Sequence, residues 1–194
     1  VFTWYYMALM TTGSLVSDSD AVLVLRAIYY AAAVLSALIG SVLSERIKRV
    51  QFLYFWMVLG AVTSLLPALS QSITATQASI IALLLGASFG VGMPSCLAYF
   101  ADSTLIENRG RMSGIVLLAA NLSALPLALI LTTFYLTTNA IALAAWRMAG
   151  LLIFVLLKPK EKISATRKPT FFVSILQNRS FVLYFIPWLM FCLI

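Results

Sequence analysis

Residues 78–101 read ASIIALLLGASFGVGMPSCLAYFA, an apolar stretch without a single charged side chain. An α-helix rises about 1.5 Å per residue, so this stretch is long enough to cross the roughly 30 Å of hydrocarbon in a lipid bilayer. A membrane-spanning strand would need only about ten residues of alternating polarity, and the stretch shows no such alternation. Residues 78–101 therefore predict a transmembrane helix.

Further apolar stretches of similar length lie on both sides of this one. They cover residues 21–43, 50–69, 113–135 and 139–157. Two shorter apolar runs, 1–12 and 181–194, are expected to be parts of two more helices, because a span needs about 20 residues. The sequence thus predicts an all-α polytopic membrane bundle, which we expect to be a fragment of a longer protein.

The composition of the whole chain favours the same conclusion. Of the 194 residues, 62% are hydrophobic and 10% are charged, against about 25% charged in soluble domains. A soluble domain of this composition would expose more apolar surface than water tolerates, which excludes soluble enzymes and disordered tails. The chain has no histidine, and Cys96 and Cys192 lie in apolar runs, so we expect no metal site, no disulfide framework and no cofactor.

Basic connections between the predicted spans alternate with connections that lack Lys and Arg. The basic segments are 44–49, 102–112 and 158–180, and the others are 13–20, 70–77 and 136–138. By the positive-inside rule the basic segments are cytoplasmic, as in a multi-pass protein of the plasma membrane. The net charge of +7 does not indicate nucleic-acid binding, because the bases flank membrane spans instead of forming one basic face.

The sequence predicts three parts. Residues 1–157 form a six-helix transmembrane bundle with a truncated first helix, residues 158–180 form a basic cytoplasmic loop, and residues 181–194 begin a seventh helix. The loop becomes amphipathic before the last run, which would place an apolar face on the bilayer surface.

Acidic and basic residues occur together in both short basic connections. The residues concerned are Glu45, Arg46, Arg49, Asp102, Arg109 and Arg111. Such residues can form a latch between helix ends at the membrane face, because ion pairs stabilise more where a helix end is partly buried. The alternative is that both turns are solvated flanks of the membrane.

The first of these turns resembles the signature loop of the major facilitator superfamily, Gly-x-Leu-Ala/Ser-Asp-Arg-x-Gly-Arg-Arg. Glu45 stands for the Asp, Arg46 and Arg49 match, and Ser41 and Lys48 replace the two glycines. A second stretch is similar to the superfamily's fourth helix and following loop. It runs Gly86-x-x-x-Gly90-x-Gly92, then Asp102, then Arg109-Gly110-Arg111-x-x-Gly114.

This resemblance covers essentially the whole chain and implies the N-terminal six-helix half, the central loop and the start of helix seven. It implies a secondary transporter that moves a small solute by alternating access, with a C-terminal bundle as partner and no enzymatic activity. It also implies that the charged residues of the two turns stabilise the outward-facing state. Gly86, Gly90 and Gly92 are expected to serve helix packing, since small residues let helices approach closely in lipid.

Some positions depart from the pattern of proton antiporters in this superfamily. Ala82 occupies a position where these antiporters often carry an Arg. The stretch 113–135, which corresponds to their fifth helix, has only Pro126 where they carry a Gly-Pro-rich motif. Both departures count against a drug–proton antiporter.

Two basic residues lie inside apolar stretches. Arg26 is close enough to the end of its stretch for the side chain to reach the membrane surface. Arg147 lies about 12 Å inside its stretch, where a charge faces a cavity or a partner. Alternatively, Trp146-Arg147 resembles the pair that opens the sixth helix in many superfamily members, which would put Arg147 at the interface.

We expect a substrate cavity for an anionic or polar solute. Its wall would consist of Trp4, Tyr5, Tyr29, Tyr30, Tyr99, Asn121, Arg147 and Trp188. Aromatic residues near membrane ends also form interfacial belts, which is the alternative for each of them.

Two other classes of function stay open at this point, a scaffold or receptor without transport activity and a membrane-embedded transferase. A transferase needs a polar catalytic cluster, and no Asp or Glu lies inside any predicted span. An ATP-driven pump is disfavoured, because the glycines at 86–92 lie within a predicted membrane helix instead of following a strand.

Overall fold

The computed structural model describes residues 2–16, 18–69, 74–133 and 135–158. Helices account for 92% of these residues, and they contain no strand. The prediction of an all-α protein is confirmed for this part of the chain. The predicted cytoplasmic loop after Lys158, the start of the seventh helix and Trp188 lie outside the described residues.

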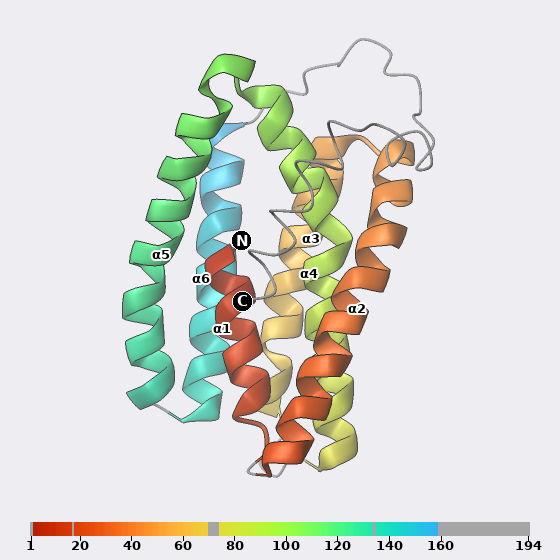
Figure 1. The fold of residues 1–194 in the computed structure, drawn as a ribbon, viewed down its shortest axis with the longest axis vertical. Helices are drawn as coiled ribbons and strands as arrows, with labels where there is room; N and C mark the ends of the chain where they lie inside the picture. Colours follow the sequence, from red (N-terminus) through yellow and green to blue (C-terminus); the bar gives the residue numbers. More distant parts are fainter. Residues whose placement is uncertain (1, 17, 70–73, 134, 159–194) are drawn as a thin grey trace. The chain divides into compact units, whose positions relative to one another are not determined.

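The described residues form six α-helices and two short 3-10 helices (Figure 1). The α-helices are α1 (Phe2–Gly13), α2 (Ser19–Arg46), α3 (Arg49–Ser64), α4 (Ala75–Ser103), α5 (Arg109–Thr133) and α6 (Leu136–Leu157), and the 3-10 helices are η1 (Leu66–Leu69) and η2 (Ile106–Asn108). Five of the helices, α2 to α6, are long and apolar enough to cross a membrane. The chain is therefore a multi-pass membrane protein.

Local signals in the sequence fix where the spans begin. Thr74 and Gln77 form a capping box at the start of α4, in which the Gln77 backbone N–H donates to Thr74 Oγ1 at 3.3 Å and the Thr74 N–H donates to Gln77 Oε1 at 3.0 Å. Asp18 caps α2 by accepting a hydrogen bond from the Asp20 backbone N–H. These side chains satisfy backbone N–H groups that the first turn of a helix leaves without partners.

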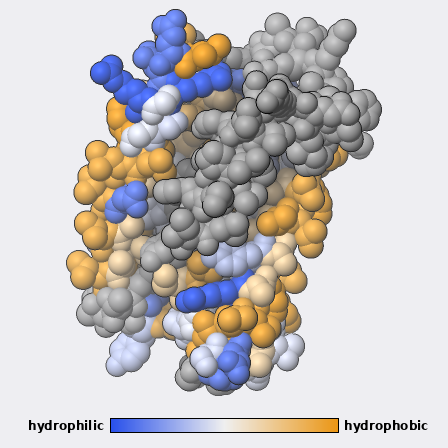
Figure 2. Space-filling model, in the orientation of Figure 1, coloured by the Kyte–Doolittle hydropathy of each residue, from blue (hydrophilic) through white to orange (hydrophobic). Residues whose placement is uncertain are grey.

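The outer faces of the spans are apolar, as lipid contact requires. On α5, for example, Leu118, Leu125 and Leu129 are each more than half exposed. Figure 2 shows hydrophobic side chains along this helix and hydrophilic ones gathered at the end where α4 is followed by α5. In water such a surface would drive aggregation, whereas in a bilayer it faces acyl chains.

The helices pack in a pattern that repeats between the two halves of the bundle. The contacting pairs of α-helices are α2 with α4, α1 with α5, α3 with α4, α1 with α6, α2 with α3, α5 with α6, α3 with α6, α1 with α4 and α1 with α2. If α1 is exchanged with α4, α2 with α5 and α3 with α6, each contacting pair corresponds to another pair of the same set or to itself. The exception is the pair α1 and α2, whose counterpart, α4 and α5, is not in this set. Exchanged helices cross the bundle in opposite directions, so the pairing of α1–α3 with α4–α6 has the form of an inverted repeat, although the contact between α2 and α4 is far more extensive than its counterpart between α1 and α5.

The most extensive of these contacts, between α2 and α4, depends on glycine. A Cβ atom added to Gly86 would overlap the backbone oxygen of Tyr29, and one added to Gly90 would overlap that of Ala33. Gly40 on α2 meets the backbone of α4 in the same way. The two helix backbones therefore approach at a distance that only glycine allows at these positions.

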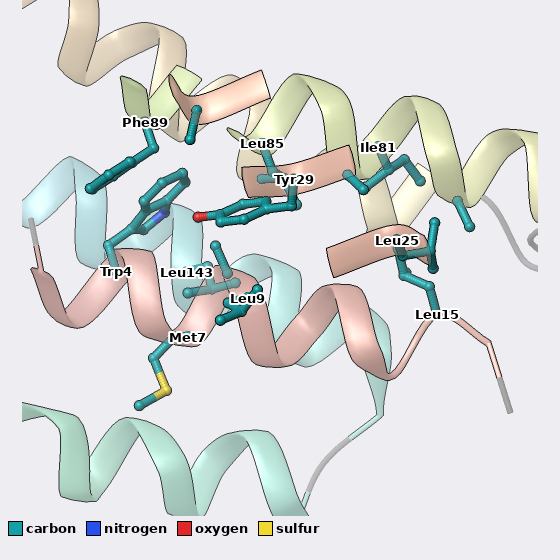
Figure 3. Packing of buried hydrophobic residues seen from close by; sticks show 14 of the residues in the cluster. Trp4, Met7, Leu9, Leu15, Leu25, Tyr29, Ile81, Leu85, Phe89 and Leu143 are labelled. Carbon is teal, nitrogen blue, oxygen red and sulfur yellow. The ribbon is translucent and has the colours of Figure 1, made fainter. Parts of the chain in front are cut away.

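A buried cluster of apolar side chains joins α1, α2, α4, α5 and α6 (Figure 3). Its largest members are Trp4, Tyr29, Phe89, Leu85 and Met7, and all are less than a tenth exposed. Figure 3 shows Trp4, Tyr29 and Phe89 turned toward one another from α1, α2 and α4. The cluster positions the first helix against the rest of the bundle.

Candidate functional site: a buried arginine between two tryptophans

Arg147 is the only charged side chain that is buried among the described residues, with 5% of its surface exposed. It lies halfway along α6, roughly 15 Å from either end of the helix at 1.5 Å per residue. Trp146, its neighbour, is partly exposed. Of the two positions that the sequence left open for Arg147, the structure has the one deep inside the span.

The guanidinium group of Arg147 lies between two indole rings. Its Cζ atom is 4.3 Å from the ring centroid of Trp4 on α1 and 4.5 Å from that of Trp56 on α3. Trp4 Nε1 donates a hydrogen bond to Ser64 Oγ at 2.8 Å, and Trp56 Nε1 donates one to the Ser88 backbone oxygen at 2.6 Å. These hydrogen bonds fix both rings in the orientation in which their faces meet the cation.

Glycine makes the space that this arrangement needs. A Cβ atom added to Gly60 would overlap Arg147 Nε and would lie 2.6 Å from Nη2. A Cβ atom added to Gly92 on α4 would overlap the Trp56 ring. Trp56 and Gly60 are four residues apart and therefore share one face of α3, which is the face that receives the guanidinium. We call Arg147, Trp4, Trp56 and Gly60 the arginine site.

The arginine site leaves part of the guanidinium without hydrogen bonds. Arg147 Nε and Nη2 are buried and have no hydrogen-bond partner among the described residues. Two desolvated cation–π contacts are worth about 4 kcal/mol together, whereas a cation at the middle of a membrane costs from about 2.5 to more than 10 kcal/mol. Each buried donor without a partner adds about 1–3 kcal/mol. The stacking alone does not offset these costs, so a hydrogen-bond acceptor at the guanidinium would stabilise the site.

An aromatic cluster adjoins the arginine site through Trp4. The Tyr5 ring centroid is 4.4 Å from that of Phe89, 5.7 Å from that of Tyr29 and 6.4 Å from that of Tyr30. The Tyr29 hydroxyl donates to the Tyr5 backbone oxygen at 3.4 Å. The structure thus brings together Trp4, Tyr5, Tyr29 and Tyr30, which the sequence placed in one cavity wall, and Arg147 stacks on the first of them.

The structure does not bring Tyr99 and Asn121 into this group. Tyr99 contacts Phe154 with ring centroids 6.2 Å apart, about two helical turns from Arg147 along α6. Asn121 is exposed, and its Nδ2 donates to the Leu117 backbone oxygen of its own helix at 2.9 Å. A polar residue in a span can satisfy itself on its own helix in this way, so polarity alone did not locate the site.

Sequence reasoning missed Trp56, Gly60, Ser64 and Ser88. The spacing Trp56, Gly60, Ser64 places one large ring and two small residues on a single helix face, midway along a span. That spacing was the available signal, because a Trp in the middle of a span is too deep for an interfacial belt.

The basic end of the bundle holds part of the charge cluster expected from the sequence. Arg49 Nη1 at the start of α3 contacts Asp102 Oδ2 near the end of α4 at 2.5 Å. Arg109 Nη2 donates to the Ala101 backbone oxygen at 2.6 Å, which joins the start of α5 to the same end of α4. Arg111 is exposed, and the side chains of Glu45 and Arg46 are not among those described.

Arg26, the other basic residue inside a span, is exposed. Its guanidinium lies beside the end of α1, with Nη2 3.5 Å from a Cβ atom added to Gly13. The C-terminal carbonyl groups of a helix attract a cation, and this position is at the end of the bundle opposite the basic turns. The side chain therefore extends toward the end of α1, and that it reaches the membrane surface stays a prediction.

Comparison with known proteins gives no relative of this chain: no family model, no curated protein and no solved structure matches it. The described residues also contain no group of three or more His, Cys, Asp or Glu side chains that could hold a metal ion. The helix pairing, the arginine site and the contacts at the basic end are the features that bear on its function.

Proposed function

We propose that this chain contains the N-terminal six-helix half of a secondary transporter of the major facilitator type, which moves a small solute by alternating access. The observation that carries the proposal is the helix pairing, in which α1–α3 and α4–α6 make corresponding contacts. Inverted three-helix repeats within each six-helix half are the building plan of these transporters.

The position of the arginine site supports the same function. Secondary transporters bind their solute near the bilayer midplane, where both sides of the membrane can be reached in turn. Arg147 lies at that depth, on a helix that packs against both α1 and α3. In this proposal a second bundle, which the superfamily resemblance implies, forms the other wall of the pathway.

The ion pair between Arg49 and Asp102 supports a gate at the basic end. The pair ties the start of α3 to the end of α4, so moving these helix ends apart requires breaking it. Asp102 is the more buried partner, and its side chain is 13% exposed. In the proposed cycle this contact holds the basic end closed while the opposite end is open, and the basic end faces the cytoplasm of a cell with this protein in its plasma membrane.

A membrane-embedded transferase is the weaker proposal. Acid–base chemistry at a membrane site needs a buried or membrane-face cluster of titratable groups. The described spans bury one charged residue, and this residue is an arginine, which stays protonated and cannot exchange a proton readily. We therefore propose a protein without enzymatic activity.

Reconstitution of the complete protein into liposomes tests this proposal. Uptake of a panel of small solutes is measured under imposed proton and sodium gradients, with protein-free liposomes as the background. A transporter gives saturable uptake above that background for at least one solute. A scaffold or receptor gives none, and a transferase instead converts an added lipid or sugar donor into product.

A further inference from the structure

We infer that Arg147 binds the anionic group of the transported solute, a carboxylate or a phosphate, through Nε and Nη2. This inference rests on the proposed transport function and names the class of its solute. It depends on three observations: the direction of the free donors, the charge balance of the spans, and the sealing of the site.

The donors of Arg147 that lack partners lie along one edge of the guanidinium. The N–H bonds of a guanidinium lie in its plane. Nε and Nη2 are neighbouring donors along one edge of that plane, and both are buried without a hydrogen-bond partner among the described residues. This edge lies against α3, since a Cβ atom added to Gly60 would overlap Nε and lie 2.6 Å from Nη2. Two neighbouring donors match the two oxygens of a carboxylate or a phosphate.

The charge balance of the spans calls for a negative partner. Five of the six Asp and Glu residues of the chain lie in the described residues, and all five are at helix ends or in the connections between helices. Asp102 forms an ion pair with Arg49 at the basic end. The charge of Arg147 is therefore not neutralised by any carboxylate of the described spans. A negatively charged solute would neutralise the charge of Arg147 inside the spans.

The donors of Arg147 are closed off from solvent, as expected for the binding site of a carrier in one of its closed states. Nε and Nη2 are shielded from solvent in the described state because this edge of the guanidinium lies against Gly60 on α3, so an anion can reach it only when α3 and α6 separate. A permanently sealed donor pair could bind nothing. In alternating access, the same group is exposed to each side in turn, so an anion can enter from one side and leave from the other.

The two sources of this chemistry can be distinguished by direct binding. The complete protein is purified, and succinate, inorganic phosphate and glycerol 3-phosphate are each titrated into it by calorimetry. Choline and glucose serve as cationic and neutral controls. Binding of succinate alone assigns a carboxylate solute, whereas binding of the two phosphates alone assigns a phosphate solute.

Matched variants then locate the binding. Arg147→Ala and Arg147→Lys remove the paired donors, and Arg147→Lys keeps the positive charge. We expect each to weaken anion binding by at least about tenfold, which is the loss of one bidentate contact. Arg26→Ala removes the other arginine of the spans, which lies at a bundle end, and should bind as the wild type does. Thermal unfolding of each variant selects those that remain folded, and Arg147→Lys serves if Arg147→Ala does not fold.

The outcomes separate this inference from the proposed function. Anion binding that is lost in the Arg147 variants and kept in Arg26→Ala supports it. Anion binding that the Arg147 variants retain overturns it. If the complete protein transports only neutral or cationic solutes and binds none of the three anions, the inference is wrong while the transport function stands. If no solute in the panel is transported or bound, both are contradicted.

Discussion

Arg49 at the start of α3 and Asp102 near the end of α4 form an ion pair at 2.5 Å, 53 residues apart in the sequence. The pair joins the two connections in which the sequence places acids and bases together. Arg49 is 34% exposed and Asp102 13%, so water screens the interaction only in part. It is a local contact at one end of the bundle.

Asp102→Asn removes the charge from this pair. We expect it to lower the free energy of unfolding by about 1 kcal/mol, because Arg49 is partly solvated. Its larger effect should be on the closed basic end. After Cys96 and Cys192 are replaced by serine, a cysteine introduced in place of Ser95, which is buried two helical turns before Asp102, should become more accessible to membrane-impermeant thiol reagents. Glu107→Gln, which neutralises an exposed acid of the same connection, is the control. Equal labelling in both variants would show that the pair does not hold this end closed.

Gly90→Ala tests the close approach of α2 and α4. The added Cβ would collide with the Ala33 backbone oxygen, which cannot move without shifting the helix, so we expect a loss of about 1–3 kcal/mol in stability. Gly150→Ala on α6 is the matched control, because an added Cβ there meets nothing within 4 Å and alanine favours the helix. Thermal unfolding of the complete protein in lipid nanodiscs measures both. A Gly90→Ala protein as stable as Gly150→Ala contradicts the packing.

Trp56→Leu tests whether the indole is part of the arginine site. The variant removes one face of the stack on Arg147 and the hydrogen bond to the Ser88 backbone oxygen. We expect a loss of about 2–4 kcal/mol, as for a large core side chain replaced by a smaller one. Trp146→Leu, in which the tryptophan is partly exposed, should change stability by about 0.5 kcal/mol or less. Similar losses in the two variants would mean that depth in the bundle does not decide the effect.

Reporter tags test the path of the chain through the membrane. A tag inserted after Thr74 precedes α4, and a tag inserted after Leu105 follows it. We expect the first tag on the outer face and the second in the cytoplasm, because the second position lies within the basic connection 102–112. Protease protection in sealed vesicles assigns each tag to a side. Both tags on one side would show that α4 does not span the membrane, and the proposed function would fall with it.

The sequence predicted the spans well, because length and apolarity alone decide whether a helix can cross a bilayer. The stretch 78–101 became α4 (Ala75–Ser103), and each of the other four stretches matches a helix within a few residues. The starts of α2 and α4 moved outward to the polar caps Asp18 and Thr74, and the end of the stretch 50–69 forms η1 instead of continuing α3. Pro94 and Pro126 lie inside α4 and α5, and neither ends its helix.

The site was predictable only in part. Arg147 could be singled out from the sequence by its depth, since a charged side chain inside a span is costly and faces a cavity or a partner. Trp56 was not conspicuous, because in a helix that is apolar on all sides the sequence does not show which face is inward. Asn121 was expected near the solute and instead bonds to its own helix. Contacts between helices decide these cases, and no pattern within one helix reports them.

The accessibility of a cysteine beside Arg147 tests alternating access most directly. Ala144 lies three residues before Arg147, on the same face of α6, and it is buried. Ala144→Cys is made in the complete protein after Cys96 and Cys192 are replaced by serine, and an impermeant maleimide is applied to right-side-out and to inside-out vesicles. We predict labelling from both sides, with Asp102→Asn increasing labelling from the basic side and decreasing it from the other. Labelling from one side only, unchanged by Asp102→Asn, would contradict this prediction.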